Sequence, residues 1–335
     1  MKKSIHFFSA LLLVASLAAC AAQPAENTVD DETAIDVVTN SYAAYDWVKQ
    51  IFADDTDHIR MTYLLENGVD LHNYQPDAED IRKIADCDVF IYVGGESDRW
   101  APDAIRSSGN SHLLAVNMLA CIGKLAKEEE VKEGMQAEEE EEEEPETDEH
   151  VWLSVRNASV ITGVIFNQVS SLVTDPEELK QITADYENYQ SELMKLDQEY
   201  AKAMSAADLD TVIFGDRFPF RYLLDDYGID YYAAFAGCSA ETEASFETVR
   251  FLAEKADEIG THEILTIETS DQKLAETIID NTSSQELGIL VMNSIQSVNA
   301  EEVKAGLSYL EVMRENLEVL KQALSRNEVH SSRGR

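Results

Sequence analysis

The sequence is poor in basic residues and, after its N-terminal segment, has no long apolar run. Its 335 residues include 26 Lys and Arg against 65 Asp and Glu, which gives a formal net charge of −39. Such an acidic chain repels phosphate groups, and this argues against nucleic acid and anionic membrane surfaces as direct partners. The same charge attracts cations, so a cationic ligand is favoured. The alternative is that the acidity serves solubility alone.

Cysteine is also scarce, and motifs that depend on close spacing of metal-binding residues are missing. The four cysteines (Cys20, Cys87, Cys121 and Cys238) form no C-x-x-C pair, which excludes a zinc ribbon and a disulfide-dense module. The H-E-x-x-H motif of zinc hydrolases is absent as well, so no enzymatic activity is expected. Cys87 and Cys121 lie in apolar stretches and are expected to be buried thiols.

The N-terminal segment has the pattern of a lipoprotein signal. Two lysines precede an apolar run over residues 5–17, which has the length of a signal-peptide core and is too short for a stable transmembrane helix. The segment ends in "LAAC", the lipobox pattern of bacterial lipoproteins. We expect cleavage before Cys20, which removes the signal peptide (residues 1–19), and lipidation of the Cys20 thiol. Residues 20–33 are expected to form a flexible tether. The mature protein is then expected to be extracytoplasmic and anchored to the membrane by acyl chains.

Apolar runs and helical patterns alternate along the rest of the chain. Runs such as "DVFIYVGG", "DTVIFG" and "HEILTIE" predict buried strands. Stretches such as "DAEDIRKIADC" and "SFETVRFLAEKADEIG" predict the helices that connect them. This alternation implies parallel sheets with right-handed crossovers. The last such stretch, residues 300–324, is predicted to be one closing helix.

One helical pattern is much longer than the others. From Pro176 to about Ala207 apolar residues recur three or four positions apart, with Asp175 as the N-cap. At 1.5 Å per residue this rod is about 45 Å long, which exceeds the width of a small domain. We therefore predict an α/β protein of two lobes with parallel sheets flanked by helices, joined by one long rigid helix, with a site in the inter-lobe cleft. The predicted boundaries are 34–174 for the first lobe with an acidic insert at 127–149, 175–207 for the bridging helix, 208–325 for the second lobe and 326–335 for a tail.

Two histidines lie where strand-to-helix loops of the first lobe are expected to meet. His72 follows a strand in "GVDLHNYQP", and His150 precedes a helix in "DEHVWLS". Because such loops share one edge of a parallel sheet, we expect the two imidazoles to lie at the same edge. Two imidazoles with acids around them suit a divalent metal of the zinc class. The alternative is that both side chains only cap a helix N-terminus or pack against their neighbours.

These segments resemble those of a known family. "GVDLHNYQP", "DCDVFIYVGGESDRWAPDAI" and "DEHVWLS" look like three segments of the substrate-binding proteins of zinc and manganese ABC importers, the ZnuA/TroA-like family. The resemblance covers essentially the whole chain after the signal. It implies the long bridging helix, a charged insert between two ligand histidines, and a permease and an ATPase that are separate chains. "FGDRFPFRYL" is similar to clostridial members, which favours the surface of a Gram-positive cell.

The resemblance is less complete in the second lobe. The family's third histidine aligns with Arg217, whose guanidinium cannot bind a cation. Either Asp216 binds the metal in its place, or Arg217 pairs with a carboxylate and leaves the metal fewer ligands. The family's later aspartate aligns near Asn293, a weaker ligand, so Glu268 is the remaining acid expected to face the cleft.

The predicted site has a set of metal ligands and a set of residues around them. The ligands are His72, His150, Glu268 and Asp216. The surrounding residues are Asp70, Asp148, Arg217 and Asn293, of which the two aspartates are expected to orient the imidazole rings. This donor set suits Zn²⁺, and its carboxylates also suit Mn²⁺.

We therefore predict a monomeric, lipid-anchored protein that captures Zn²⁺ or Mn²⁺ and delivers it to an ABC permease. The alternative is a binding protein for an organic ligand, of siderophore or cobalamin type, on a similar two-lobed scaffold. The glutamate run before His150 is predicted to concentrate cations at the rim of the cleft rather than to form the tight site. The alternative for this glutamate run is that it forms an inert, solvated loop.

Overall fold

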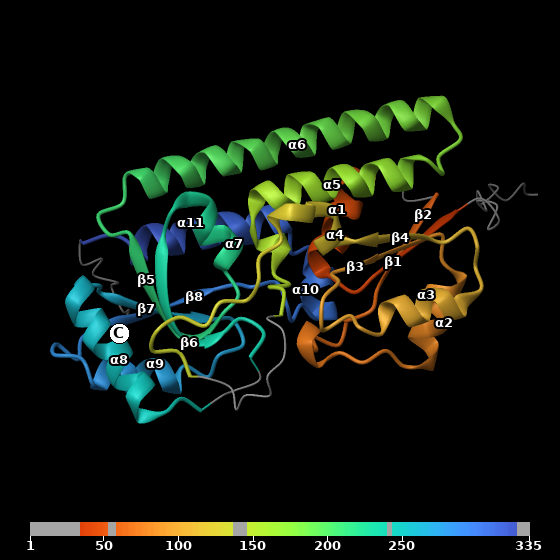
Figure 1. Ribbon diagram of the computed structural model, residues 1–335. Coiled ribbons are helices and arrows are strands. Elements are labelled where there is room, and N and C mark those ends of the chain that lie inside the picture. The colour runs from red at the N-terminus through yellow and green to blue at the C-terminus, as the bar shows by residue number, and fades with distance from the viewer. Residues whose placement is uncertain (1–33, 53–57, 137–145, 240–242, 327–335) are drawn as a thin grey trace, which may run out of the picture. The chain divides into compact units, whose positions relative to one another are not determined.

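The short apolar runs form two four-stranded parallel sheets in the computed structural model, which describes residues 34–52, 58–136, 146–239 and 243–326 (Figure 1). The first sheet has the order β2 (Ile59–Tyr63), β1 (Ile35–Thr39), β3 (Val89–Tyr92) and β4 (Leu114–Asn117). The second has the order β6 (Asp230–Ala236), β5 (Thr211–Phe218), β7 (Glu263–Ile267) and β8 (Gly288–Met292). All neighbouring strands run parallel, which the alternation of strands and helices predicts.

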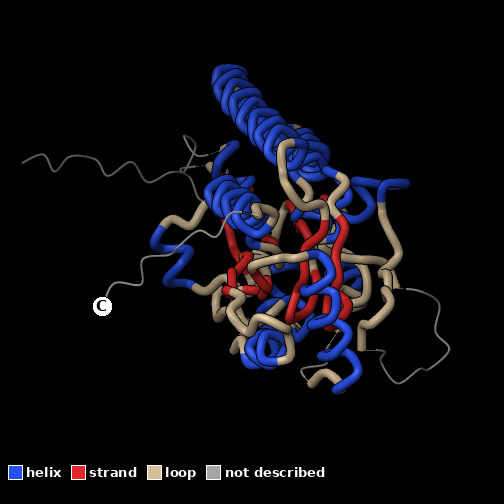
Figure 2. The backbone as a smooth tube through the Cα atoms, turned by 90° about the vertical axis from the view of Figure 1, so that its left-hand side faces the viewer, coloured by secondary structure: helices blue, strands red, loops and turns tan. Residues whose placement is uncertain are grey.

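Helices connect the strands and lie on both sides of the sheets (Figure 2). Those that accompany the first sheet are α1 (Tyr42–Ile51), α2 (Ala78–Asp86), α3 (Ala101–Ser108), α4 (Met118–Ile122) and α5 (Val155–Ser170). Those that accompany the second are α7 (Arg221–Tyr227), α8 (Phe246–Ile259), α9 (Lys273–Asp280) and α11 (Tyr309–Ala323). Helix α10 (Ala300–Ala305) follows β8 in the chain but lies beside the loop after β2, where the Ala300 N–H donates to the Glu66 carbonyl (2.7 Å). The predicted fold class, two α/β lobes with parallel sheets, is confirmed.

Burial on both faces explains why the sequence of a central strand such as β3 is apolar throughout. Every residue of β3 is buried, and Phe90 is 0% exposed. One large hydrophobic cluster contains residues of both sheets, of α6 and of α11. A smaller cluster fills the space between the second sheet and helices α8 and α9. The two lobes therefore share most of their core.

The long helix α6 (Pro176–Ser205) links the two lobes. The Asp175 carboxylate accepts hydrogen bonds from the backbone N–H groups of Glu177 and Glu178 (2.8 and 3.1 Å), and Pro176 occupies the first turn. Its apolar side packs against α1 and α5 of the first lobe and against α7 and α11 of the second. The predicted bridging helix is confirmed. The exact lobe boundaries stay a prediction.

The prediction of a single closing helix over residues 300–324 is wrong. Helix α10 ends at Gly306, which has a φ of +84°, a conformation that favours glycine. Ser308 is extended, and α11 starts after it. Between the two helices the Leu307 carbonyl accepts a hydrogen bond from the Tyr42 hydroxyl of α1. The break therefore lets the second lobe contact the first.

Several predictions fall outside the described residues. These are the signal peptide (1–19), the lipidation site Cys20, the tether (20–33), residues 137–145 of the acidic insert and residues 327–335 of the tail. Among the described residues, no helix has the length and apolar character needed to cross a membrane.

Substituting Leu196 tests the packing of α6 between the lobes. Leu196 is 0% exposed, whereas Met194 on the same helix is 61% exposed. We expect Leu196→Ala to lower the free energy of unfolding by about 2–5 kcal/mol because it leaves a cavity in the shared core. Met194→Ala is the matched control and is expected to stay within about 0.5 kcal/mol of the parent. Urea unfolding of both variants measures the difference, and equal stability of the two would contradict the packing.

Candidate metal centre

His72 is positioned by a short 3₁₀ turn, Leu71–Asn73, in the segment between β2 and α2. The Asp70 carboxylate accepts a hydrogen bond from the His72 backbone N–H (3.0 Å) and so caps this turn. The ring Nδ1 lies 2.8 Å from Oγ of Ser97, which follows β3. The side chain is only 10% exposed. Loops after β2 and β3 of the first sheet thus hold this residue, one at its backbone and one at its ring.

His150 is fully buried and immediately precedes the short turn Val151–Leu153. One oxygen of Asp148 lies 2.9 Å from its backbone N and 2.9 Å from its ring Nδ1. Asp148 is held in turn, because its carbonyl accepts a hydrogen bond from the Tyr222 hydroxyl (2.9 Å). The carboxylate favours a proton on Nδ1 of His150 and leaves Nε2 with a lone pair.

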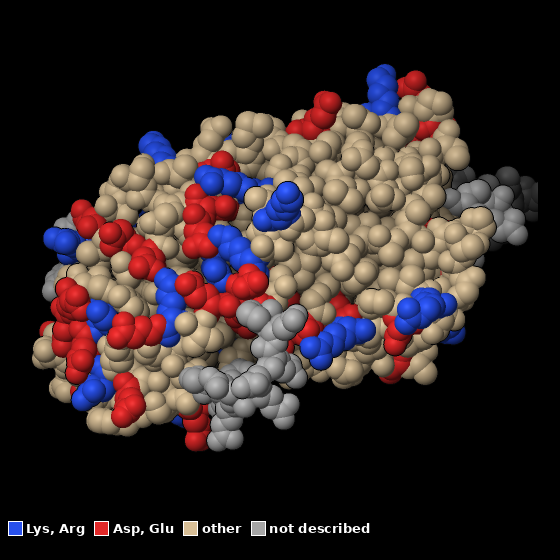
Figure 3. Space-filling model, viewed as in Figure 1, with Lys and Arg blue, Asp and Glu red and all other residues tan. Residues whose placement is uncertain are grey.

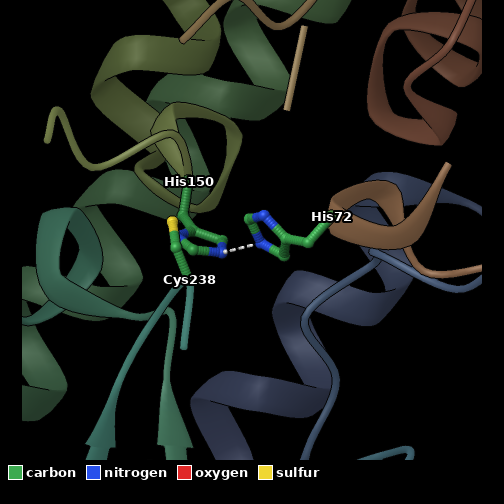
Figure 4. A group of neighbouring side chains, drawn as sticks. All are labelled: His72, His150 and Cys238. Atoms are coloured by element: carbon green, nitrogen blue, oxygen red, sulfur yellow. Dashed lines mark hydrogen bonds between the residues drawn. The ribbon is translucent and has the colours of Figure 1, made fainter. Parts of the chain in front are cut away.

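The two imidazoles meet through their Nε2 atoms, which are 3.1 Å apart (Figure 4). One of these atoms must donate a proton to the other. Since the Asp148 contact directs the His150 proton to Nδ1, the consistent arrangement has His72 donating from Nε2. Nδ1 of His72 then accepts from the Ser97 hydroxyl. One hydrogen bond, from Nε2–H of His72 to the Nε2 lone pair of His150, therefore joins the two rings.

Cys238 supplies a third donor atom. It follows β6, and its Sγ and the nitrogens of His72 and His150 all lie within 4.8 Å of one another (Figure 4). Within the described ranges, this is the one group of three or more His, Cys, Asp or Glu donors close enough to share an ion. Gly237 makes the approach possible, because a Cβ at that position would be 3.0 Å from Cε1 of His150. The sequence patterns did not single out Cys238.

Burial and nearby charges shift the pKa values of His72, His150 and Cys238, and the direction is not the same for all three. Burial and the neighbouring His150 lower the pKa of His72 to about 3. Burial of His150 opposes its protonation, but the hydrogen bond to Asp148 and nearby carboxylates outweigh it and raise its pKa. Burial, with the charges of Glu129 and Glu149, raises the pKa of Cys238. At neutral pH these shifts favour a neutral His72 and a protonated Cys238 thiol.

Glu149 is a buried acid beside His72. Burial raises its pKa to about 7, although it accepts a hydrogen bond from the Ser97 backbone N–H (2.7 Å). Its Oε2 lies 3.6 Å from Nδ1 of His72 and has no hydrogen-bond partner among the described residues. This oxygen can accept a hydrogen bond from Nδ1–H when Nε2 of His72 binds another group.

Arg217 and Asp216 do not join this donor group. The Arg217 guanidinium donates to the Asp70 carboxylate (2.9 Å), and both side chains are largely buried. Asp216 accepts hydrogen bonds from the backbone N–H groups of Arg217 (2.8 Å) and Ile267 (3.5 Å). Arg217 thus pairs with a carboxylate across the two lobes, and Asp216 braces the ends of β5 and β7.

Glu268 and Asn293 also lie apart from the donor group. Both oxygens of Glu268 accept from Ser294, one from its backbone N–H (2.8 Å) and one from its hydroxyl (2.7 Å). Asn293 accepts from the backbone N–H of Ile295 (2.8 Å). These side chains stabilise the loops after β7 and β8. The roles of Glu268 and Asp216 as metal ligands stay predictions.

Comparison with known proteins gives a consistent result. The family model described as "Zinc-uptake complex component A periplasmic" (ZnuA) matches residues 37–323. The zinc-binding lipoprotein AdcA of Streptococcus pneumoniae is 31% identical over 313 residues, which cover 93% of this chain and 60% of that protein. The high-affinity zinc uptake system protein ZnuA of Bacillus subtilis is 28% identical, covering 95% of this chain and 98% of that protein. The chain therefore spans only part of the length of the AdcA relatives.

Solved structures agree with the sequence relatives. The Zn(II)-bound AdcA of Streptococcus pneumoniae matches with a TM-score of 0.67 at 25% identity and covers 88% of this chain and 58% of that one. The metal-dependent lipoprotein YcdH of Bacillus subtilis matches with a TM-score of 0.68 at 27% identity and covers 87% of this chain and 99% of that one. Because the family model spans most of the sequence, the chain belongs to the ZnuA family of periplasmic zinc-uptake components.

Proposed function

We propose that this protein captures Zn²⁺ outside the cytoplasmic membrane and delivers it to an ABC permease for import. The observation that carries the proposal is the approach of the His72 and His150 Nε2 atoms to 3.1 Å. Two nitrogens bound to one tetrahedral zinc at 2.0–2.1 Å lie about 3.3 Å apart. The spacing of the two nitrogens therefore already fits one bound zinc ion. The names of the relatives, zinc-binding and zinc-uptake proteins, support the same cargo.

Capture requires a proton to leave the space between the rings. Zn²⁺ binds lone pairs, so Nε2 of His72 gives up its proton and Nδ1 takes the role of donor. Ser97 Oγ at 2.8 Å and Glu149 Oε2 at 3.6 Å are the acceptors available to that Nδ1. His150 needs no such change, because Asp148 already favours its Nδ1 tautomer. One imidazole is thus ready to bind, and the other switches tautomer on binding.

The family and the N-terminal signal support a location and a set of partners for this protein. Members of this family are transport components, and we propose that this chain likewise catalyses no reaction. It works with a permease and an ATPase on separate chains. Lipidation at Cys20 anchors the protein, as a monomer, to the outer side of the membrane, and the streptococcal relatives support a Gram-positive surface. The organic-ligand alternative has no support among the relatives.

Removing either imidazole tests the proposed cargo site. We expect His72→Ala and His150→Ala each to weaken Zn²⁺ binding by more than about 100-fold, since loss of an orienting partner alone costs 10–100-fold. Competition against a chromophoric chelator measures the dissociation constants. His112→Ala is the control, because His112 is exposed and lies outside the donor group. Tight binding that survives both substitutions would remove the metal-transport proposal.

Substituting Asp148 tests whether its carboxylate sets the pKa and the orientation of His150. Its hydrogen bond and charge raise the pKa of His150, so the proton competes with Zn²⁺ as pH falls. Asp148→Asn removes that charge and lowers the pKa of His150, and the loss of affinity then begins at a lower pH. We also expect binding about 10–100-fold weaker at about pH 8, because the ring is less firmly oriented and less basic. Zinc titrations between about pH 8 and about pH 5 measure both effects. A profile that coincides with that of the parent would show that Asp148 does not act through His150.

A further inference from the structure

The thiol of Cys238 differs in its surroundings from Cys87 and Cys121, the other two cysteines in the described ranges. Cys87 is 1% exposed, lies in the large hydrophobic cluster and donates to the Ile84 carbonyl, as a packed thiol does. Cys121 also packs against that cluster. Cys238 instead lies within 4.8 Å of nitrogens of both His72 and His150. A sulfur that shares a buried polar site with two imidazoles is placed as a ligand rather than as core packing.

A segment of the acidic insert holds the loop that carries Cys238. We call residues 127–136 the strap; it is the yellow segment beside α7 and β6 in Figure 1. The Glu129 carboxylate accepts a hydrogen bond from the Cys238 backbone N–H (2.7 Å). At the end of the strap, the Gln136 backbone N–H donates to the Ala234 carbonyl (2.9 Å), and its side chain accepts from Ser245 N–H (3.0 Å). The strap therefore contacts the chain before, at and after Cys238.

Charged pairs fasten the strap to the second lobe. Lys132 pairs with Asp230 and lies 3.8 Å from the centre of the Tyr231 ring. The Arg221 guanidinium lies 3.7 Å from the Glu130 carboxylate and also donates to the Glu128 carbonyl. On the face shown in Figure 3, basic and acidic side chains alternate over the part of the protein formed by the second lobe. Single exposed pairs contribute little, but several pairs along one short segment together fix its position.

We propose that Cys238 is the third zinc ligand, that Glu129 of the strap positions it, and that its sulfur makes the site select Zn²⁺ over Mn²⁺. This inference rests on the proposed function. On binding, a Zn–Sγ bond forms, the S–H bond breaks and the thiol proton passes to the solvent. Thiolate ligands suit Zn²⁺, whereas Mn²⁺ prefers carboxylate and water oxygens. The site thereby gains a donor from the second lobe to add to the two imidazoles of the first.

Cobalt substitution tests the sulfur directly. Co²⁺ bound to the parent protein is expected to show an intense near-ultraviolet band from thiolate-to-metal charge transfer. The band should vanish in Cys238→Ser and persist in Cys121→Ser. Absence of the band from the parent protein would overturn the inference without relying on any variant. If Zn²⁺ binding still depends on His72 and His150 in that case, the proposed function stands and only the thiol ligand fails.

Selectivity gives an independent readout. We expect Cys238→Asp to reduce the ratio of Zn²⁺ to Mn²⁺ affinity at least about 10-fold, because it replaces a soft donor with a hard one. Competition titrations with each metal measure the ratio, and an unchanged ratio would overturn the assignment. Circular dichroism confirms that the variant is folded.

Glu129 is tested as a positioning residue. Glu129→Ala removes the acceptor for the Cys238 N–H, and we expect it to weaken Zn²⁺ binding about 10-fold or more and to diminish the cobalt–thiolate band. Glu129→Gln keeps an acceptor oxygen and is expected to restore both. Glu133→Ala, an exposed residue of the same strap, is the matched control. Equal effects of the alanine variants at 129 and 133, or no effect of either, would contradict the positioning role.

Discussion

The contact between the Nε2 atoms of His72 and His150 is the constraint on which the site depends. Two imidazoles 3.1 Å apart cannot both carry a charge on these atoms without strong repulsion. Burial lowers the pKa of His72 and thereby keeps it neutral, while Asp148 orients His150. One proton, shared in a hydrogen bond, satisfies both Nε2 atoms. A divalent cation is the other species that satisfies both, and the surrounding acids compensate its charge.

The fold brings these groups together through the carboxyl ends of its parallel strands. His72 lies in the segment between β2 and α2, and Cys238 follows β6 of the other sheet. The α6 helix and the shared core connect the two lobes, and the Arg217–Asp70 ion pair links them beside His72. A guanidinium at this position neutralises one buried acid of a strongly acidic protein. It also removes that acid from competition for the metal.

The sequence predicted the features that repeat along the chain or follow from local capping. Apolar runs predicted the parallel strands, and Asp175 with Pro176 predicted the start of α6. The break at Gly306 was missed because the apolar periodicity continues through it, although a glycine is a common residue at a helix C-cap. Cys238 was missed for another reason. A single cysteine has no spacing pattern, and its approach to His150 depends on Gly237 and on a strap more than 100 residues away in the chain.

X-ray absorption at the zinc edge of the zinc-loaded full chain tests the central claim most directly. The His72–His150 pair predicts two nitrogen neighbours at about 2.0–2.1 Å with the outer-ring scattering of imidazole, and Cys238 adds one sulfur at about 2.3 Å. A zinc ion surrounded only by oxygen atoms, with no imidazole scattering, would contradict the account, because the ion would then be held by carboxylates elsewhere in the protein. Imidazole scattering without sulfur would keep the cargo site and remove Cys238 from it.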